Sequence, residues 1–393
     1  MTVLDCLIGL ERCETKPPWS LQSGRLGVLM NRSSVDRDLR FAYETLERAF
    51  PRRLKSIFTP QHGLWSDAQA NMIETPSSVH TQLGIPIYSL YSDTRRPTPE
   101  MMQGIDTLVV DLQDAGTRIY TFIWTMLECM RACESSGVNM VVLDRPNPVG
   151  GQIIEGPLLD PGYRSFVGDH SIPMRHGLTM GEIARLFHTE LGFNVQLDVV
   201  EMSQWKPSSM FDELGRPWLP PSPNLPTIAT TLVYVGQVLL EGTSLSEGRG
   251  TTTPFELMGS PELPAIELAA LLNGLDCPGV RFLPTSFQPT FDKFAGRDCG
   301  GVSIHCTSKN DYRPFRSTIE SLVTIQTHWP AALDWLDPPY EYELEKAPID
   351  ILYGGPKLRI GKGTVSELSY VDVHQWRERV DGSLLYPRGP FSA

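Results

Sequence analysis

Acidic, amide and arginine side chains gather in three segments of the sequence, and each segment directly follows a short apolar run. These segments are residues 59–67 (TPQHGLWSD), 111–120 (DLQDAGTRIY) and 144–157 (DRPNPVGGQIIEGP). Carboxyl groups that lie close together can do acid–base chemistry, because one donates a proton while the other accepts one or attacks. A single residue of this kind often only closes a turn or caps a helix. Three successive segments that all carry carboxylates favour a shared site.

Two further segments carry residues of the same kinds. They are residues 173–177 (PMRHG) and 246–256 (SEGRGTTTPFE). The first places Arg175 and His176 before a predicted helix, and the second combines Glu247 and Arg249 with glycines. Backbone N–H groups of such a glycine-rich loop can bind an anion. The same pattern is also typical of a tight turn with a structural arginine, and both interpretations stay open at this point.

The sequence contains none of the motifs that are typical of several other common chemistries. The first predicted strand is followed by NRSSVDRD, which lacks the glycines of a dinucleotide-binding turn. The GGPKLRIGKGT segment near the C-terminus has the wrong spacing for a phosphate-binding loop. Neither the HExxH motif of zinc hydrolases nor the GxSxG motif of serine hydrolases occurs. Chemistry by paired carboxylates therefore remains the favoured hypothesis.

The elements that must position these residues alternate between strands and helices. Short runs rich in Val, Ile and Leu predict strands at residues 26–30, 54–58, 85–90, 107–112, 139–143 and 195–201. Amphipathic patterns predict helices at 38–50, 98–103 and 120–135, and another helix begins at Thr179, where Glu182 has capping-box spacing. Such alternation predicts a mostly parallel, Rossmann-like α/β sheet. Ligands of these sheets bind beyond the carboxyl ends of the strands, where the polar segments lie.

The proline-dense stretch 216–227 (RPWLPPSPNLPT) is a candidate domain junction, because prolines exclude helix and central strand there. After it the pattern is less regular, with helices expected at 266–272 and 317–327 and a strand at 301–306. We therefore predict a Rossmann-like catalytic domain over residues 1–230 and a smaller α+β ancillary domain over residues 231–393.

Composition narrows the possible partners. The chain has 393 residues and a net charge of −12, which argues against nucleic acid as a partner. No run of about 18 apolar residues occurs, so we expect no membrane span. Seven cysteines without CxxC spacing suggest neither a disulfide framework nor a zinc site. Because no signal peptide is recognisable in MTVLDCLIGLERCETK, we expect a cytoplasmic location.

Read in order, the segments resemble a bacterial family once known only as a domain of unknown function (DUF1343) and now associated with exo-β-N-acetylmuramidases of the NamZ type. The motifs that carry the resemblance include TPQHGLWSDAQANMIE, VVDLQDAGTRIYTFIWTM, VVLDRPNPVGG, PMRHGLTMGEIARLF, WLPPSPNLPT and GGVSIHCTSKN. The resemblance extends from about Leu7 to Leu358. It implies an active site between the two domains, release of N-acetylmuramic acid from non-reducing ends of peptidoglycan fragments, and no metal or cofactor.

The chain departs from this family at one position. Many members carry Glu-His-Gly where this chain has Gln61-His62-Gly63, and that glutamate is a favoured catalytic candidate in the family. An amide cannot donate or accept a proton at neutral pH, so the acid must lie elsewhere if the chain is an enzyme. Two alternatives follow: a non-catalytic receptor for sugars or muropeptides on the same fold, and a glycosidase for another sugar.

We assign roles to the candidate residues on this basis. The predicted catalytic carboxyls are Glu155 and Glu247, followed by Asp111 and Asp114, which would suit orientation if the N-acetyl group of the substrate is the nucleophile. The predicted substrate-binding residues are Gln61, His62, Arg118, Tyr120, Asn147, His176 and Arg249. An arginine suits the lactyl carboxylate of a muramyl sugar, because its planar fork matches a carboxylate.

Overall fold

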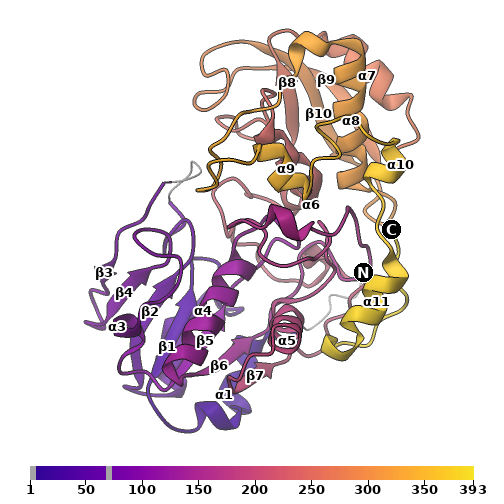
Figure 1. Ribbon diagram of the computed structural model, residues 1–393. Coiled ribbons are helices and arrows are strands. Elements are labelled where there is room, and N and C mark those ends of the chain that lie inside the picture. The colour runs from indigo at the N-terminus through magenta and orange to yellow at the C-terminus, as the bar shows by residue number, and fades with distance from the viewer. Residues whose placement is uncertain (1–5, 68–72) are drawn as a thin grey trace.

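Six short apolar runs form the parallel part of a seven-stranded sheet in the computed structural model, which describes residues 6–67 and 73–393 (Figure 1). The strands are β1 Leu26–Met30, β2 Leu54–Thr59, β3 Ser78–Val79, β4 Pro86–Ser89, β5 Thr107–Asp111, β6 Asn139–Leu143 and β7 Leu197–Val200. Their order is β3-β4-β2-β1-β5-β6-β7, and β3 pairs antiparallel with β4. The predicted Rossmann-like α/β class and its six strands are confirmed.

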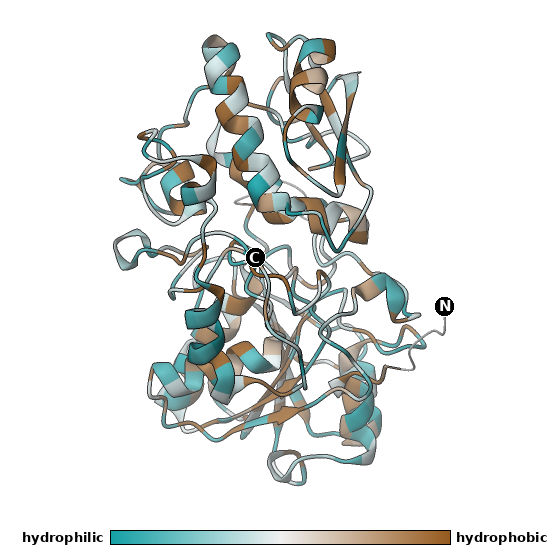
Figure 2. Ribbon diagram, turned by 90° about the vertical axis from the view of Figure 1, so that its right-hand side faces the viewer, coloured by the Kyte–Doolittle hydropathy of each residue, from teal (hydrophilic) through white to brown (hydrophobic). Residues whose placement is uncertain are grey.

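Helices cover both faces of this sheet, which explains why its central strands are apolar on both sides. On one face lie α1 Gly9–Thr15 and α2 Ala42–Ala49, and on the other lie α3 Pro99–Met102, α4 Phe122–Ser136 and α5 Met180–Glu190. The predicted start of α5 is confirmed, since Thr179 and Glu182 form a reciprocal capping box there. Figure 2 shows the strands as a brown, hydrophobic layer between these helices.

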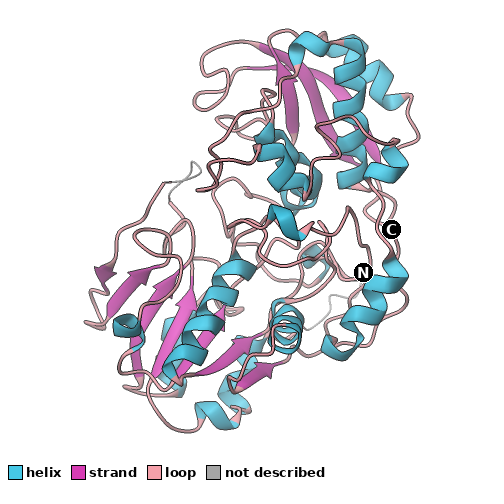
Figure 3. Ribbon diagram, in the orientation of Figure 1, coloured by secondary structure: helices cyan, strands magenta, loops and turns pink. Residues whose placement is uncertain are grey.

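The second lobe contains a three-stranded antiparallel sheet covered by helices (Figure 3). Its elements are β8 Leu257–Ser260, β9 Val280–Phe287, β10 Cys299–Cys306, α6 Ile228–Gln237, α7 Ala265–Asn273, α8 Pro314–His328, α9 Pro348–Tyr353 and α10 Val365–Leu368, and the chain then continues into α11 Val373–Val380. The predicted helices at α7 and α8 and the strand at β10 are confirmed. The sequence did not reveal β8, β9 or α6.

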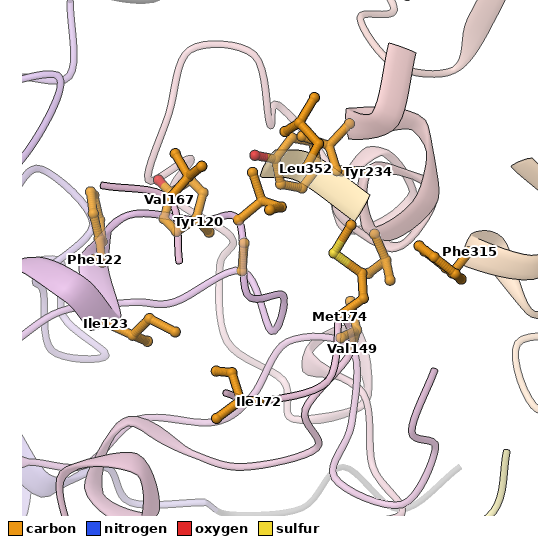
Figure 4. Close-up of a cluster of buried hydrophobic side chains, with 14 of the residues drawn as sticks. Tyr120, Phe122, Ile123, Val149, Val167, Ile172, Met174, Tyr234, Phe315 and Leu352 are labelled. Carbon is orange, nitrogen blue, oxygen red and sulfur yellow. The ribbon is translucent and has the colours of Figure 1, made fainter. Parts of the chain in front are cut away.

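One hydrophobic core runs through both lobes. Buried side chains of the first lobe, including Val149 and Met174, belong to the same cluster as Tyr234, Phe315 and Leu352 of the second lobe (Figure 4). Such a shared core holds the facing surfaces of the two lobes in a fixed relation. No helix within residues 6–67 and 73–393 is long and apolar enough to cross a membrane.

The C-terminal residues return to the first lobe, where α11 lies beside α5 (Figure 1). The Trp376 indole N–H donates to the carbonyl of His176 at 3.0 Å, and the Tyr386 hydroxyl donates to the buried carboxylate of Asp144 at 2.6 Å. Burial raises the pKa of Asp144 to about 7 although several groups donate to it. The end of the chain therefore ties the second lobe to the first.

Candidate active site between the two lobes

A small polar pocket lies where the two lobes meet. The first lobe and its connection contribute Gln61, His62, Ile119, Tyr120, Thr121, Val167, Ser222, Asn224 and Leu225, and the second lobe contributes Tyr234, Glu241, Arg249, Phe255, Tyr340 and Glu341. Gln61 and His62 follow the carboxyl end of β2, and Tyr120 and Thr121 directly precede α4. The pocket therefore occupies the edge of the sheet at which α/β proteins bind ligands.

Glu341 is a buried carboxyl group of this pocket with a raised pKa. Burial raises its pKa to about 7, and the nearby charge of Glu241 adds to the rise. The Tyr91 hydroxyl donates to one Glu341 carboxyl oxygen at 2.8 Å, and the Gln61 amide donates to the other at 3.4 Å. A buried carboxyl of this kind can carry a proton at neutral pH and release it to a substrate.

The backbone around Glu341 adopts a tight turn with unusual torsion angles. Tyr340 and Glu343 exchange two backbone hydrogen bonds of 2.9 Å, and Glu341 and Tyr342 between them have φ values of 44° and 68°. Positive φ is uncommon in residues other than glycine and costs free energy, so it persists where surrounding contacts enforce it. Strain of this kind clusters at functional sites, and here it aims the Glu341 carboxyl into the pocket.

A second carboxylate, Glu241, is held by two donors on the opposite side. It lies in the short 3₁₀ helix Val238–Gly242, and its two oxygens accept hydrogen bonds of 2.6 Å from Arg249 and Tyr340. Burial lowers the pKa of Arg249, whereas the carboxylates of Glu241 and Glu247 raise it. Together the carboxylates outweigh burial, so the pKa of Arg249 is raised. The guanidinium is thus a permanent cation that fixes the Glu241 carboxylate.

Glu247 supports this arrangement from behind. Its carboxylate forms an ion pair with Arg249 at 3.1 Å and accepts a hydrogen bond from Lys293 at 3.0 Å. Burial alone would raise the pKa of Glu247, but the two cations outweigh burial and lower it. Glu247 does not line the pocket and is bound as a carboxylate, so the structure places this predicted catalytic residue one layer behind Arg249.

Gln61 connects the two lobes through hydrogen bonds to Thr121 and Glu341. Its amide oxygen accepts from the Thr121 hydroxyl at 2.8 Å, and this contact directs the amide nitrogen toward Glu341. His62, the next residue, lines the same pocket with a φ of 71°. The prediction that both residues lie at the site agrees with this geometry.

Tyr120 offers an unused hydrogen-bonding group. It lines the pocket, and its buried hydroxyl makes no hydrogen bond within residues 6–67 and 73–393. Burial raises its pKa well above the usual range, so the hydroxyl stays protonated. Because a buried hydroxyl without a partner is costly, a ligand in the pocket is the natural acceptor or donor for it.

The other predicted carboxyls of the first lobe lie outside the pocket lining. Asp111 forms a bidentate ion pair with Arg145 at 2.6 and 2.7 Å, and burial raises its pKa against the pull of that arginine. Asp114 accepts from the backbone N–H of Gly116 at 2.7 Å and lies 3.4 Å from His176. The prediction that these two carboxyls line one pocket with Gln61 is therefore wrong, because local partners engage both of them.

Glu155 is a contact between the lobes. Its carboxylate binds Arg175 at 3.0 Å and accepts from the backbone N–H of Phe315 at 3.0 Å, at the start of α8. Burial raises the pKa of Glu155, and Arg175 opposes the rise. The carboxylate lines a different pocket, on the side of Phe315 and α11, so the structure separates it from Glu341.

Three predicted binding residues also hold the backbone. The guanidinium of Arg118 donates to four carbonyls, two in the first lobe and two in α9, at 2.9–3.1 Å. Asn147 donates to the carbonyl of Leu178 and accepts from the N–H of Val149. His176 accepts from the N–H of Leu178. These three side chains shape the loops beside the pocket and do not line it.

No group of three or more His, Cys, Asp and Glu side chains is placed to hold a metal ion in the part of the chain that the structure describes. The pocket instead offers a protonated acid, a fixed carboxylate, a cation and several hydroxyl and amide groups. This combination suits a neutral or anionic polyol, because sugars present many hydroxyls to such donors and acceptors.

Comparison with known proteins gives consistent matches over nearly the whole chain. Residues 26–229 match the family model described as exo-β-N-acetylmuramidase NamZ, N-terminal, and residues 232–386 match its C-terminal counterpart. The peptidoglycan β-N-acetylmuramidase NamZ of Bacillus subtilis (strain 168) is 43% identical over 316 residues, which cover 80% of this chain and 76% of that protein.

Solved structures show the same architecture. A DUF1343 family protein from Bacteroides fragilis superposes with a TM-score of 0.88 at 30% identity, and the match covers 98% of this chain and 100% of that one. A second DUF1343 protein of the same organism gives a TM-score of 0.75 at 25% identity with the same coverage.

Proposed function

Because the chain belongs to the NamZ family of exo-β-N-acetylmuramidases, we propose that the pocket between its lobes is the active site of that reaction, with Glu341 as the general acid. The predicted family and the prediction of a glycosidase are confirmed by the Bacillus subtilis relative. The proposed substrate is a peptidoglycan fragment whose terminal N-acetylmuramic acid is released. The assignment of roles to particular residues rests on the geometry of the pocket.

The observation that carries the proposal is the raised pKa of Glu341 within a pocket built by both lobes. Hydrolysis of a glycosidic bond needs an acid that protonates the departing oxygen while the bond to the anomeric carbon breaks. A carboxyl with a pKa of about 7 is protonated in about half of the molecules at neutral pH and can supply this proton. Tyr91 and Gln61 then stabilise the carboxylate that remains, because both donate to it.

Glu241 suits a different task from that of Glu341. Both of its oxygens are engaged, by Arg249 and by Tyr340, so it is poorly placed to attack the anomeric carbon. A fixed carboxylate can instead orient the N–H of the 2-acetamido group, whose carbonyl oxygen then attacks the anomeric carbon. Water later opens the resulting ring, and its proton returns to Glu341. In this route one acid and one orienting carboxylate are enough.

Gln61 agrees with an enzyme better than with a receptor that has lost its acid. Its amide bridges Thr121 and Glu341, so it positions a carboxyl that the second lobe supplies. The glutamine thus changes the environment of the acid and leaves the acid itself in place.

The experiment exchanges Glu341 for Gln, which keeps the shape and removes the proton. On a natural disaccharide, N-acetylmuramyl-N-acetylglucosamine, we expect kcat to fall at least ~100-fold. On 4-nitrophenyl N-acetyl-β-muramide the loss should be much smaller, because nitrophenolate leaves without protonation. Glu345→Gln, an exposed neighbour, is the matched control and should change neither rate. Equal losses on both substrates, or normal turnover of the disaccharide, would remove Glu341 from the role of acid.

A further inference from the structure

Arg95 lies in the loop after β4, in an aromatic enclosure next to Glu341. Its guanidinium carbon is 4.3 Å from the ring centroid of Tyr91, 4.2 Å from that of Tyr342 and 5.6 Å from that of Phe166. Two of these rings adjoin the acid, since the Tyr91 hydroxyl donates to Glu341 and Tyr342 follows it in the chain. The cation and the acid are thus held in a fixed relation by one tyrosine ring.

The hydrogen-bonding capacity of Arg95 is largely unused. Its Nη1 donates to the carbonyl of Ser92 at 2.6 Å. Its Nε is buried and makes no hydrogen bond within the described residues. Nε and Nη2 form one edge of the guanidinium, the edge that binds carboxylates through two parallel hydrogen bonds. A buried N–H without a partner is costly, so this edge is prepared for a ligand that the protein itself does not supply.

The neighbouring arginines are already engaged. The two Nη groups of Arg118 donate to four backbone carbonyls, and Arg249 binds the carboxylates of Glu241 and Glu247. Arg95 faces aromatic rings, where a guanidinium is weakly hydrated and keeps its charge. Among Arg95, Arg118 and Arg249, Arg95 is therefore the one whose Nε–Nη2 edge makes no hydrogen bond or ion pair within the described residues.

We propose that Arg95 binds the lactyl carboxylate of the terminal N-acetylmuramic acid and thereby sets the preference for this sugar over N-acetylglucosamine. The inference rests on the proposed function and names the feature of the substrate that the site selects. The two sugars differ only in the lactyl ether on the pyranose ring, so a site that separates them must recognise that group. With the glycosidic oxygen at Glu341, ring substituents of the same sugar lie in the neighbourhood of Tyr91 and Arg95.

The test compares two substrates that differ in this group, 4-nitrophenyl N-acetyl-β-muramide and 4-nitrophenyl N-acetyl-β-glucosaminide. The measured quantity is the ratio of their kcat/KM values in the wild type, Arg95→Ala and Arg95→Lys. We expect Arg95→Ala to lower the ratio ~10–100-fold, the scale of one charge-assisted bidentate contact. Arg95→Lys should recover part of it, because lysine keeps the charge and loses the fork.

The ratio separates recognition from a structural role. If Arg95 only supports Tyr91 and Glu341, both substrates lose rate together and the ratio stays, which overturns the inference. Arg96→Ala is the matched control, since Arg96 is exposed and pairs with Glu128, and it should leave the ratio unchanged.

Failure of the proposed function would give a different pattern, in which the wild type cleaves neither substrate. Calorimetric binding of free N-acetylmuramic acid and free N-acetylglucosamine then decides the inference by itself. A preference for N-acetylmuramic acid that Arg95→Ala abolishes supports it, and equal binding of both sugars by the wild type overturns it.

Discussion

Placing a carboxyl at position 61 is the sharpest perturbation of this site. In Gln61→Glu the new side chain still accepts from the Thr121 hydroxyl, but once ionised it can no longer donate to Glu341. The atoms that now form the amide–carboxyl contact are 3.4 Å apart, so two carboxyls would face each other at nearly that distance. Two like charges at such a separation share one proton and titrate as a pair. We therefore expect the variant to hold the catalytic proton to higher pH.

The size of the effect follows from the distance. Two unit charges about 4 Å apart interact with ~4 kcal/mol at an effective dielectric constant of about 20. Since one pKa unit corresponds to about 1.4 kcal/mol, the upper limit is a rise of ~3 units. Movement of the side chains apart reduces this, so we expect the second proton of the pair to leave ~1–2 units above the wild-type pKa of about 7.

The assay is the pH dependence of kcat/KM on the muramyl disaccharide. A general acid works while protonated, so activity falls as the pH rises through its pKa, and this alkaline limb should move upward in Gln61→Glu. Gln61→Met, which lacks both the donor and the charge, is the control and should shift the limb by less than the glutamate does. An unmoved limb in Gln61→Glu refutes the placement of the acid beside residue 61. A wild type that is inert and becomes active only in Gln61→Glu refutes Glu341 as the acid.

Three further outcomes follow from buried carboxyls. Glu155→Gln leaves the buried Arg175 without its charged partner, so the free energy of unfolding in urea should fall by ~3 kcal/mol while kcat changes little; a large loss of kcat without loss of stability would return Glu155 to the chemistry. Burial raises the pKa of Glu341 from 4.5 to about 7, so the folded protein keeps a proton that the unfolded chain releases. The free energy of unfolding should therefore fall by roughly 3 kcal/mol as the pH rises between these values, and Glu341→Gln should flatten that slope in urea titrations at several pH values. Tyr386→Phe removes a donor from buried Asp144 and should lower the free energy of unfolding by ~1–3 kcal/mol and speed proteolysis of the C-terminal residues; unchanged proteolysis would show that this contact does not hold the tail.

Much of the first lobe could be predicted from sequence because its strands are buried on both faces. Runs such as residues 107–111 (TLVVD) are apolar throughout, so their length and flanking turns identify them. In the second lobe the signals are weaker. The edge strand β9 alternates between buried and exposed residues and contains Pro284, and α6 is rich in β-branched residues that disfavour isolated helices. Both elements form because tertiary contacts outweigh local preference.

The sequence predicted where the pocket lies in the fold, but only some of the residues that line it. Polar groups do gather beyond the strand ends, and Gln61, His62, Tyr120 and Arg249 line one pocket there. Sequence spacing could not show that Asp111 would form an ion pair with Arg145, which follows the next strand. Such ion pairs depend on which strands become neighbours, and that information is not local.

The sequence did not reveal Glu341, the proposed acid, because this residue is far along the chain from the polar segments of the first lobe. Glu341 contacts a residue 280 positions earlier, in a loop that carries no periodic pattern. One signal was present: in PPYEYELEK a carboxyl is enclosed by two tyrosines after two prolines, a composition that favours a rigid, partly buried loop. Glu241 lies in LEGTSLSEGRG, a few residues before the glycine-rich loop 246–256 that the sequence singled out.

The division of the site between the lobes has a physical consequence for catalysis. Gln61 on the first lobe donates to Glu341 and lowers its pKa, whereas burial and the Glu241 carboxylate of the second lobe raise it, so groups from both lobes together set the pKa of Glu341. Docking in turn depends on buried polar contacts such as Arg118, which binds carbonyls of both lobes and whose own pKa burial lowers to about 9. Because removing one partner of such a contact leaves buried groups unsatisfied, the lobes are bound tightly in one arrangement. Many polar residues near the pocket therefore serve to hold the arrangement in which a single carboxyl becomes an acid at neutral pH, and this is why so few of the carboxylates at the strand ends are free for chemistry.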